Sequence, residues 1–219
     1  MKVLWTAFLD FLYPPKCPVC RESIARHGEW CLPCLSKVLA VRAIHPAAHR
    51  LRYLDSCQVL CDYRGGAKKL IQAIKFHGDL KYLVHLHWLL HRYSNLEKLV
   101  QIDAVIPIPL HRDRLKERGY NQTEKIFQEW AAAKKLIWIN DVLIRSRPTQ
   151  PLWNLPVLER RRNIKDAFQI TRPQAVAGKA ILLVDDIFTS GTTMDECSKA
   201  LKRAGAISVH GLAIASGAD

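Results

Sequence analysis

Short apolar runs alternate with longer amphipathic stretches between residues 56 and 215. Apolar runs bounded by turn residues predict buried strands, here at residues 58–63, 103–108, 142–144, 180–184 and 207–215. The stretches between them predict helices at residues 68–76, 80–93, 121–134, 159–167 and 194–204. Strands that alternate with helices indicate an α/β domain with a mainly parallel sheet flanked by helices.

Turn residues separate these elements. We expect Gly65-Gly66 to end the first strand, and Gly205 to close the last helix as its C′ residue. Residues 36–55 are interpreted as a connector. Residues 146–158 contain three prolines and are interpreted as a loop.

The first fifteen residues are apolar. Asp10 interrupts this run, no small-residue cleavage site follows, and the run is too short to span a bilayer, so a signal peptide and a membrane span are both disfavoured. Leu4, Phe8 and Leu12 lie four residues apart. We therefore expect an amphipathic helix that packs on the body of a soluble, cytoplasmic protein.

Four cysteines form two Cys-x-x-Cys pairs, Cys17 with Cys20 and Cys31 with Cys34. The two-residue spacing lets both thiolates of a pair reach one ion, so the pattern predicts a tetrahedral Cys₄ zinc site. Because four protein ligands fill the coordination sphere, the Zn²⁺ would be structural. The alternative is four reduced cysteines in a loop, and two such pairs this close rarely arise without a metal.

The seven cysteines are too few and too unevenly spaced for a secreted disulfide scaffold. Cys57 and Cys61 lie on one face of a predicted strand, and Cys197 lies on the last predicted helix. We expect all three to be buried core thiols. His27 is interpreted as a solvated loop histidine, with zinc ligation as the alternative.

A second candidate site follows the strand predicted at residues 180–184. Two acids, Asp185 and Asp186, come directly after the strand, and small polar residues then open a helix: Thr189, Ser190, Gly191, Thr192 and Thr193. Backbone N–H groups at a helix start bind phosphate, helped by the helix dipole. Gly191 would let the backbone approach the anion closely, and hydroxyl groups add donors.

Carboxylates at the end of a parallel strand lie where ligands of open α/β sheets bind. They can accept hydrogen bonds from sugar hydroxyls or face a hydrated Mg²⁺. The segment is no Walker P-loop, because no Gly-Lys-Ser/Thr follows. The alternative interpretation is a capped helix after a buried strand with solvated acids.

A third candidate, the basic segment, covers residues 111–122 and follows the apolar run that contains Pro107. We expect a mobile basic loop that closes over a second anionic group such as pyrophosphate, with Pro107, Arg112, Arg114, Lys116 and Arg118 as its residues. A solvated charged turn is the alternative. The cluster at residues 160–163 fits a solvated helix face and a polyphosphate contact equally well.

The chain has 219 residues and a formal net charge of +13. This excess of Lys and Arg favours anionic partners such as phosphates, nucleotides or nucleic acid. The alternative is a soluble basic protein without such a partner, and the charge alone does not decide between the two. The hydrophobic content of 49% is in the range of globular proteins and excludes a disordered chain.

In order along the chain, these motifs resemble the ComF family (also called ComF/GntX), which is similar to type I phosphoribosyltransferases. The resemblance covers nearly the whole chain and rests on the Cys₄ pattern, Tyr63-Arg-Gly, Ile74-Lys-Phe-His-Gly78, Pro107-Ile-Pro109, Arg118-Gly-Tyr-Asn-Gln122, Arg145-Ser-Arg-Pro-Thr-Gln150, Arg161-Arg-Asn163 and the final acid-containing loop. Phe188 and Ser190 depart from the residues that many members carry, and neither departure removes a ligand.

The resemblance implies a small N-terminal zinc module in residues 1–50 and a phosphoribosyltransferase-like domain in residues 51–219. It implies that Asp185 and Asp186 bind the ribose 2′- and 3′-hydroxyls, and that the loop from Thr189 to Thr193 binds the 5′-phosphate. The ligand would be phosphoribosyl pyrophosphate (PRPP) or a nucleotide 5′-phosphate, with Mg²⁺.

Three functions follow from the resemblance. The first is a DNA-uptake factor of natural transformation that binds single-stranded DNA or nucleotides, together with other uptake proteins. The second is an active Mg²⁺-dependent phosphoribosyltransferase whose acceptor is a nucleobase or ammonia. The third is a regulator that kept only the ligand pocket. A homodimer is a further expectation, since related folds often dimerise.

Overall fold

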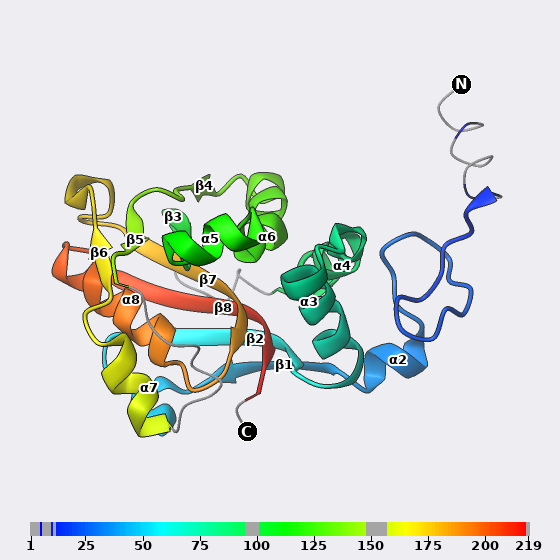
Figure 1. Ribbon diagram of the computed structural model, residues 1–219, viewed down its shortest axis with the longest axis horizontal. Helices are drawn as coiled ribbons and strands as arrows, with labels where there is room; N and C mark the ends of the chain where they lie inside the picture. Colours follow the sequence, from blue (N-terminus) through cyan, green and yellow to red (C-terminus); the bar gives the residue numbers. More distant parts are fainter. Residues whose placement is uncertain (1–4, 6–9, 11, 95–100, 148–156, 218–219) are drawn as a thin grey trace.

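The computed structural model describes residues 5, 10, 12–94, 101–147 and 157–217, and only the backbone of residues 157, 158, 160 and 161. Figure 1 shows a sheet with helices on both faces and a smaller N-terminal part at one end. Among the described residues, no helix has the length and apolarity that crossing a bilayer requires.

The central sheet has six strands in the order β1-β2-β8-β7-β3-β4. Their bounds are Leu39–Ile44 for β1, Ser56–Asp62 for β2, Ala104–Pro107 for β3, Ile137–Trp138 for β4, Ala180–Phe188 for β7 and Ser208–Ser216 for β8. All neighbours are parallel except β1, which pairs antiparallel with β2. The predicted α/β fold with a mainly parallel sheet is confirmed.

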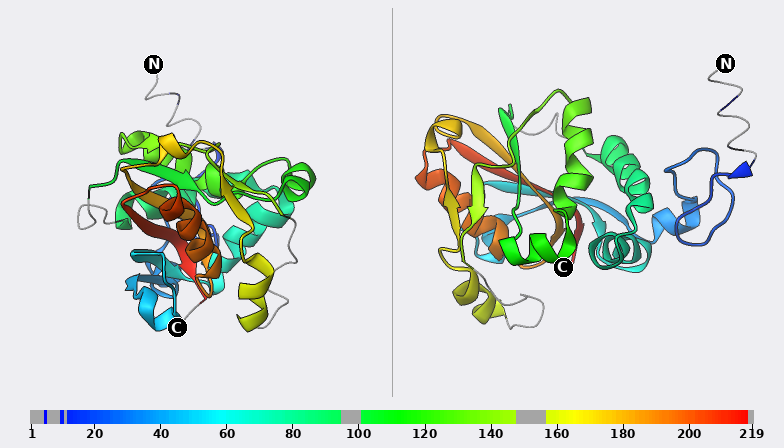
Figure 2. Two further views of the ribbon diagram at one scale, coloured as in Figure 1. Left: turned by 90° about the vertical axis from the view of Figure 1, so that its left-hand side faces the viewer. Right: turned by 45° about the horizontal axis from the view of Figure 1, so that its top comes forward.

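Helices cover both faces of this sheet, which makes a three-layer core. Helices α3 (Gly65–His77), α4 (Leu83–Tyr93) and α6 (Gln122–Ala133) pack on one face through a cluster that includes Phe127 and Trp130. Helix α8 (Thr192–Arg203) packs on the other face, where Met194 and Leu201 are buried. Figure 2 shows these layers from two further directions.

The face with α8 is completed by a two-stranded antiparallel sheet, β5 (Leu143–Arg145) with β6 (Phe168–Ile170), and by α7 (Val157–Ile164). Shorter helices are α2 (Leu32–Ser36), α5 (Arg112–Arg118) and the 3₁₀ turns η1 (Pro46–His49), η2 (Leu80–Tyr82) and η5 (Pro173–Ala175). Helix α7 ends earlier than predicted, and most of the proline-rich loop, residues 148–156, lies outside the described residues.

The sequence places some boundaries wrongly. Strand β7 does not end at residue 184, because its pairing with β8 continues to Phe188 opposite Ser216. Asp185 and Asp186 are therefore strand residues, not turn residues. The first predicted strand ends before Gly65-Gly66 as expected, at Asp62, and these two glycines form the first residues of α3.

Two segments predicted to be irregular are ordered elements. The connector contains β1, which forms an edge of the sheet, so part of residues 1–50 belongs to this sheet; the domain boundary at residue 50 stays a prediction. The basic segment is not a loop but helix α5, which His111 caps by accepting a hydrogen bond from the Asp113 N–H and which ends at Gly119 with φ +80°.

Helices α3 and α4 lie next to the N-terminal part in Figures 1 and 2, and Trp30 contacts both helices. Its ring is 5% exposed, and its Nε1–H donates to the carbonyl of His85 on α4 at 3.3 Å. A Cβ on Gly66 would lie 2.8 Å from the Trp30 ring and 2.5 Å from Val19, so glycine is needed at this contact. Leu4 and Phe8 of the predicted first helix lie outside the described residues.

Candidate functional site

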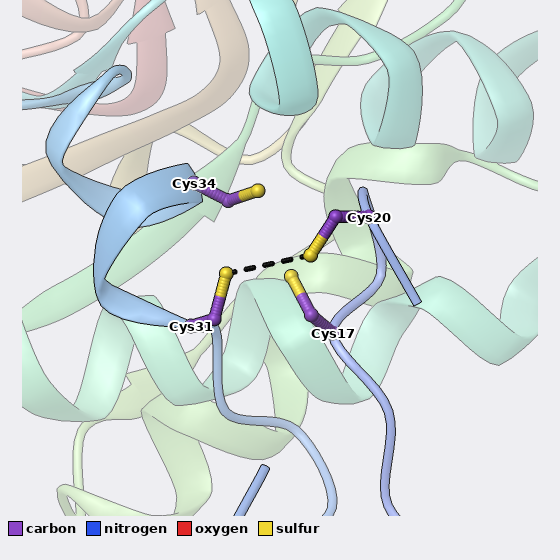
Figure 3. Close-up of side chains that lie close together, drawn as sticks. All are labelled: Cys17, Cys20, Cys31 and Cys34. Carbon is purple, nitrogen blue, oxygen red and sulfur yellow. Dashed lines mark hydrogen bonds between the residues drawn. The ribbon is translucent and has the colours of Figure 1, made fainter. Parts of the chain in front are cut away.

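Four cysteine sulfurs converge in the N-terminal part (Figure 3). The Sγ atoms of Cys17, Cys20, Cys31 and Cys34 lie within 4.8 Å of one another, with 3.5 Å between those of Cys20 and Cys31. Among the described residues, this is the one group of three or more donors close enough to share an ion. Four converging thiols match the ligand set and number of a structural Zn²⁺ site.

The other sulfur and imidazole side chains lie apart from this cluster. Cys57, Cys61 and Cys197 are at most 2% exposed, which confirms the prediction of buried thiols, although Cys57 and Cys61 contact different core clusters. His27 is a surface residue whose Nε2 lies 3.1 Å from a carboxylate oxygen of Asp10. The zinc set therefore consists of cysteines alone.

Asp185 and Asp186, the acid pair, lie near the carboxyl end of β7 and line a cavity beside the sheet. Oδ2 of Asp186 lies 3.3 Å from Nζ of Lys75, and the two side chains are 4% and 18% exposed. Oδ1 of Asp185 accepts hydrogen bonds from the Asp186 N–H at 2.8 Å and from Oγ1 of Thr123 at 3.4 Å.

These contacts divide the charge between the two acids. Burial raises the pKa of Asp185 well above its usual value; the negative charge of Asp186 adds to the increase, and Lys75 offsets part of it. Two adjacent buried carboxylates cannot both ionise cheaply. Asp185 therefore keeps its proton more readily than an ordinary carboxyl, and Asp186 forms the ion pair with Lys75.

The chain from residue 189 to 193 forms a turn that opens α8. Within residues 12–94, 101–147 and 157–217, no hydrogen bond engages the backbone N–H groups of residues 189–193. Oγ of Ser190 and Oγ1 of Thr192 lie 2.9 Å apart. Free N–H groups at the start of a twelve-residue helix are the physical requirement for an anion site.

Gly191 is required by packing as well as by its backbone conformation. Its φ of +72° is unfavourable for residues with a Cβ. A Cβ at this position would lie 2.5 Å from Cδ1 of Leu51 and 2.6 Å from Cζ of Phe188. The turn is thus seated directly on a second segment, residues 49–54.

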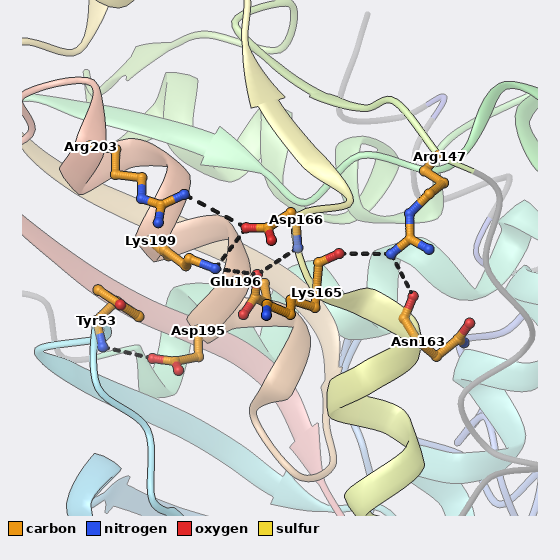
Figure 4. Close-up of polar contacts among 9 residues, drawn as sticks. All are labelled: Tyr53, Arg147, Asn163, Lys165, Asp166, Asp195, Glu196, Lys199 and Arg203. Carbon is orange, nitrogen blue, oxygen red and sulfur yellow. Dashed lines mark hydrogen bonds and ion pairs between the residues drawn. The ribbon is translucent and has the colours of Figure 1, made fainter.

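Asp195 on α8 fixes that second segment (Figure 4). Its Oδ1 accepts hydrogen bonds from three successive backbone N–H groups, those of Arg52 at 2.9 Å, Tyr53 at 2.7 Å and Leu54 at 3.2 Å. The ring of His49 packs edge-on against Phe188 at 5.6 Å between centroids. Residues 49–54 therefore pack against the turn and are hydrogen-bonded to the helix that follows it.

A cavity of about 440 Å³ brings several predicted residues together. Its walls include both acids, two threonines of the turn and two arginines of the basic segment: Asp185, Asp186, Thr189, Thr193, Arg114 and Arg118. Ser190, Gly191 and Thr192 belong to the same turn. The acids, both ends of the turn and the two arginines thus share one concave surface.

The other residues predicted in the basic segment do not reach this cavity. Residues four apart share one face of a helix, so Arg114 and Arg118 point one way from α5, and Arg112 and Lys116 point another. Arg112 lines a separate cavity with Leu115 and Glu124, and Lys116 is exposed. Pro107 is buried inside β3.

Sequence reasoning missed the wall contributed by α3. Lys68, Gln72 and Lys75 lie on the face of α3 that lines the cavity, opposite the buried Leu70, Ile71 and Ile74. Their spacing of four and three residues is a polar stripe that the sequence displays, and it is easily taken for a solvated helix face. Tyr63 and Arg145 also line the cavity.

A second polar network ties α7 to the middle of α8, as Figure 4 shows. Nζ of Lys199 lies 2.8 Å from Asp166 and 3.3 Å from Glu196, and Glu196 also accepts a hydrogen bond from the Asp166 N–H at 3.0 Å. Arg147 donates to the carbonyls of Asn163 and Lys165 at the end of α7. Helix α8 thus supports both the turn and the segment around α7.

Two family models match this chain. The model described as "Double zinc ribbon domain" matches residues 8–46, which contain the four cysteines. The model described as "Phosphoribosyl transferase domain" matches residues 145–218, which contain the acid pair and the turn. One match thus covers the cysteine cluster, and the other covers the acid pair and the turn.

Curated relatives match over most of their length. "Competence protein F" of Haemophilus influenzae is 28% identical over 206 residues, with 91% of this chain and 84% of that protein covered. "DNA utilization protein YhgH" of Escherichia coli O157:H7 is 29% identical over 220 residues, with 90% and 95% covered. "Competence protein ComFC" of Streptococcus pneumoniae is 26% identical over 203 residues, with 87% and 82% covered.

A solved structure of the glutamine phosphoribosylpyrophosphate (PRPP) amidotransferase from B. subtilis, complexed with ADP and GMP, overlaps 58% of this chain and a quarter (25%) of its own length. Its sequence identity is 22% and its TM-score is 0.39. The cysteine cluster, the acid-containing strand and turn, the two domain matches and the relatives agree, and together they support the resemblance of this chain to the ComF family.

Proposed function

We propose that the cavity binds PRPP or a nucleotide 5′-phosphate. The observation that carries this proposal is the turn at residues 189–193, whose N–H groups have no partner in the described chain and whose two ends, Thr189 and Thr193, line one cavity with two acids. A phosphate needs those donors, and a ribose needs hydrogen-bond acceptors at the distance that a sugar spans.

In this proposal each group has one task. The N–H groups of residues 189–193 and the hydroxyls of Thr189 and Thr193 bind the 5′-phosphate. Asp185 and Asp186 accept hydrogen bonds from the ribose hydroxyls. Arg114 and Arg118 face the pyrophosphate, for which the planar guanidinium is well suited. Arg112, Lys116 and Pro107 are no longer part of the proposed site.

Two metals have different places in the proposal. Zn²⁺ on Cys17, Cys20, Cys31 and Cys34 is structural and stabilises a segment too short for its own core. Mg²⁺ is proposed to enter with the diphosphate of PRPP. The acid pair by itself does not fit a directly bound Mg²⁺, because Lys75 already faces Asp186 and Asp185 favours its protonated form.

The relatives named for competence and DNA utilization support a cellular role in the uptake or use of external DNA. A groove of about 350 Å³ continues from the cavity between α3 and α5 and shares Lys75, Phe76, Arg114 and Arg118 with it. Phe76 is 54% exposed there. Basic and aromatic side chains along a groove bind single strands by backbone neutralisation and base stacking.

Single-stranded DNA in the cytoplasm is therefore the proposed macromolecular partner, with other uptake proteins and a second copy of this chain as further predicted partners. Arg118→Ala and Phe76→Ala should weaken binding of an oligonucleotide, and Lys116→Ala, on the far face of α5, is the matched control. Affinity should fall steeply with rising salt. A flat salt response, or equal effects of all three substitutions, would count against this groove.

An active phosphoribosyltransferase is the second candidate function. It is favoured by the grouping of acids, both ends of the turn and arginines in one cavity, because such catalysis depends on positioning and charge stabilisation and needs no nucleophilic side chain of the protein. Release of pyrophosphate from PRPP, screened over nucleobases and ammonia, tests it. Silence across the whole screen would leave the binding role alone.

Calorimetric titration of the zinc-loaded protein with PRPP and Mg²⁺ tests the ligand proposal. Thr193→Val removes a cavity hydroxyl at constant shape, and Thr171→Val, whose hydroxyl bonds to Asp141 far from the cavity, is its control. We expect about a tenfold loss of affinity in the first and none in the second. No heat with the unmodified protein would refute the ligand assignment.

A further inference from the structure

Lys75 forms an ion pair with Asp186, one member of the acid pair. It lies near the end of α3, and its ammonium is 3.3 Å from Oδ2 of Asp186. Only 18% of the Lys75 side chain and 4% of the Asp186 side chain are exposed. Solvent therefore screens this pair weakly, and the interaction is stronger than that of a surface ion pair.

The three groups Asp185, Asp186 and Lys75 are close to electrically neutral as a set before a ligand binds. Asp186 carries a negative charge, Lys75 a positive charge, and Asp185 keeps its proton more readily than an exposed carboxyl. Tyr63 and Arg118 also sense the charge of Asp186. Burial raises the pKa of Tyr63 and the charge of Asp186 adds to this increase, whereas burial lowers the pKa of Arg118 and the charge of Asp186 offsets part of this decrease. The other charged residues that line the cavity are cations: Lys68, Arg114, Arg118 and Arg145.

A divalent cation meets three obstacles here. Mg²⁺ prefers several oxygen ligands at ~2.1 Å, and an ion at that distance from Oδ2 of Asp186 would stand close to the Lys75 ammonium. The two positive charges repel each other in a poorly solvated site. The second carboxyl, on Asp185, would have to release its proton to help.

We propose that Lys75 is a positioning residue whose ammonium occupies the side of the Asp186 carboxylate on which a metal ion would otherwise bind. The acid pair therefore accepts hydrogen bonds from sugar hydroxyls and excludes a free divalent cation. The ammonium takes the place that a metal ion would hold on this carboxylate. Mg²⁺ then reaches the cavity only as a complex with a diphosphate. This inference rests on the proposed function for its ligand, but the exclusion of the metal is a property of the protein alone.

The test is Mn²⁺ binding to the zinc-loaded full-length protein without PRPP, followed by electron paramagnetic resonance of the free ion. We expect no binding site in the unmodified protein below the millimolar range. Lys75→Met, which keeps the chain length and removes the charge, should bind Mn²⁺ at least about tenfold more tightly. Lys75→Gln, which keeps a polar contact to Asp186, serves as the second variant should the first fold poorly.

Two controls locate the effect. Lys68→Met removes a cation of the same cavity that lies over the Tyr63 ring and forms no ion pair with an acid of the described residues, so it should not create a site. Asp186→Asn combined with Lys75→Met should abolish the gained site. Tight Mn²⁺ binding by the unmodified protein that Asp186→Asn removes would overturn the proposal, as would unchanged Mn²⁺ affinity in both Lys75 variants.

A PRPP titration of the same proteins separates this inference from the proposed function. If the unmodified protein binds no PRPP while Lys75→Met still gains the Mn²⁺ site, the proposed ligand is wrong and the assignment of Lys75 stands. If PRPP binds and neither Lys75 variant gains the metal, the ligand stands and Lys75 has no such effect.

Discussion

The carboxylate of Asp195 accepts a hydrogen bond from the backbone N–H of Tyr53 at 2.7 Å, across 142 residues of sequence. The same oxygen also serves the N–H groups of the two neighbours of Tyr53. This one side chain connects the helix that begins with the candidate phosphate turn to the segment on which that turn rests. The geometry of the turn therefore depends on a residue that lies outside the cavity.

Asp195→Ala should destabilise the protein and weaken phosphate binding together. Three N–H groups lose a charged acceptor, which we expect to cost about 2–3 kcal/mol, and Asp195→Asn, which keeps one neutral oxygen, about 1 kcal/mol. Denaturant unfolding and titration with ribose 5-phosphate measure the two effects. Unfolding curves identical to that of the unmodified protein would show that the contact has no energetic weight.

Gly191→Ala should destabilise the protein in the absence of any ligand. The new Cβ would lie 2.5 Å from Leu51 at a residue with φ +72°, so we expect a loss of about 3 kcal/mol. Gly119→Ala is the matched control, because φ is +80° there and nothing lies within 4 Å of the added carbon. It should cost only about 1 kcal/mol. Equal losses would mean that the contact with Leu51 is relaxed without cost.

The two acids should respond to neutralisation with opposite signs. Burial raises the pKa of Asp185 in the folded state above its usual 3.8, so the folded protein binds a proton that the unfolded chain releases. Stability is then lost as the pH rises above about 4 toward the folded-state pKa. Asp185→Asn removes this cost, and we expect a gain on the order of 1 kcal/mol at neutral pH.

Asp186→Asn leaves the Lys75 ammonium without its carboxylate in a mostly buried position. We expect a loss of about 1–3 kcal/mol, below the value for a fully buried pair because Lys75 keeps some solvent contact. Thermal unfolding at several pH values measures both variants. The interpretation of the charges would be wrong if Asp185→Asn lowered the unfolding temperature at neutral pH or left its pH dependence unchanged.

Removal of zinc should loosen the N-terminal part before the sheet unfolds. We expect one zinc per chain on the four thiolates. Chelation or Cys31→Ser should expose Trp30, visible as a red shift of its fluorescence and faster hydrogen exchange around α2 and the start of α3. Cys57→Ala removes a buried thiol outside the cluster and should keep the zinc. Freshly purified protein without zinc would contradict the assignment.

The local signals in the sequence were sufficient for the features that depend on neighbours along the chain. The spacing of the cysteines identifies the cysteine cluster, because the two thiols of a Cys-x-x-Cys pair lie close enough along the chain to reach the same ion. The apolar run at residues 180–184 predicts the strand that carries the acids, and the small polar residues around Gly191 predict the start of the helix that follows. Gly205, with φ +94°, closes α8 as predicted.

Features decided by distant partners were missed. Edge strand β1 is irregular in sequence and gains its order from pairing with β2. Lys75 resembles any solvated lysine of an amphipathic helix until β7 brings Asp186 opposite it. Arg112 and Arg114 are equivalent in a loop, and only the winding of α5 separates them onto two faces.

The amide resonances of residues 189–193 give the most direct test of the central claim. In a ¹⁵N-labelled, zinc-loaded protein, ribose 5-phosphate should shift the signals of Gly191, Thr192 and Thr193 in a saturable way, and ribose without phosphate should not. Saturating ribose 5-phosphate that leaves these N–H signals in place, while any other part of the protein responds, would contradict the assignment of the phosphate turn.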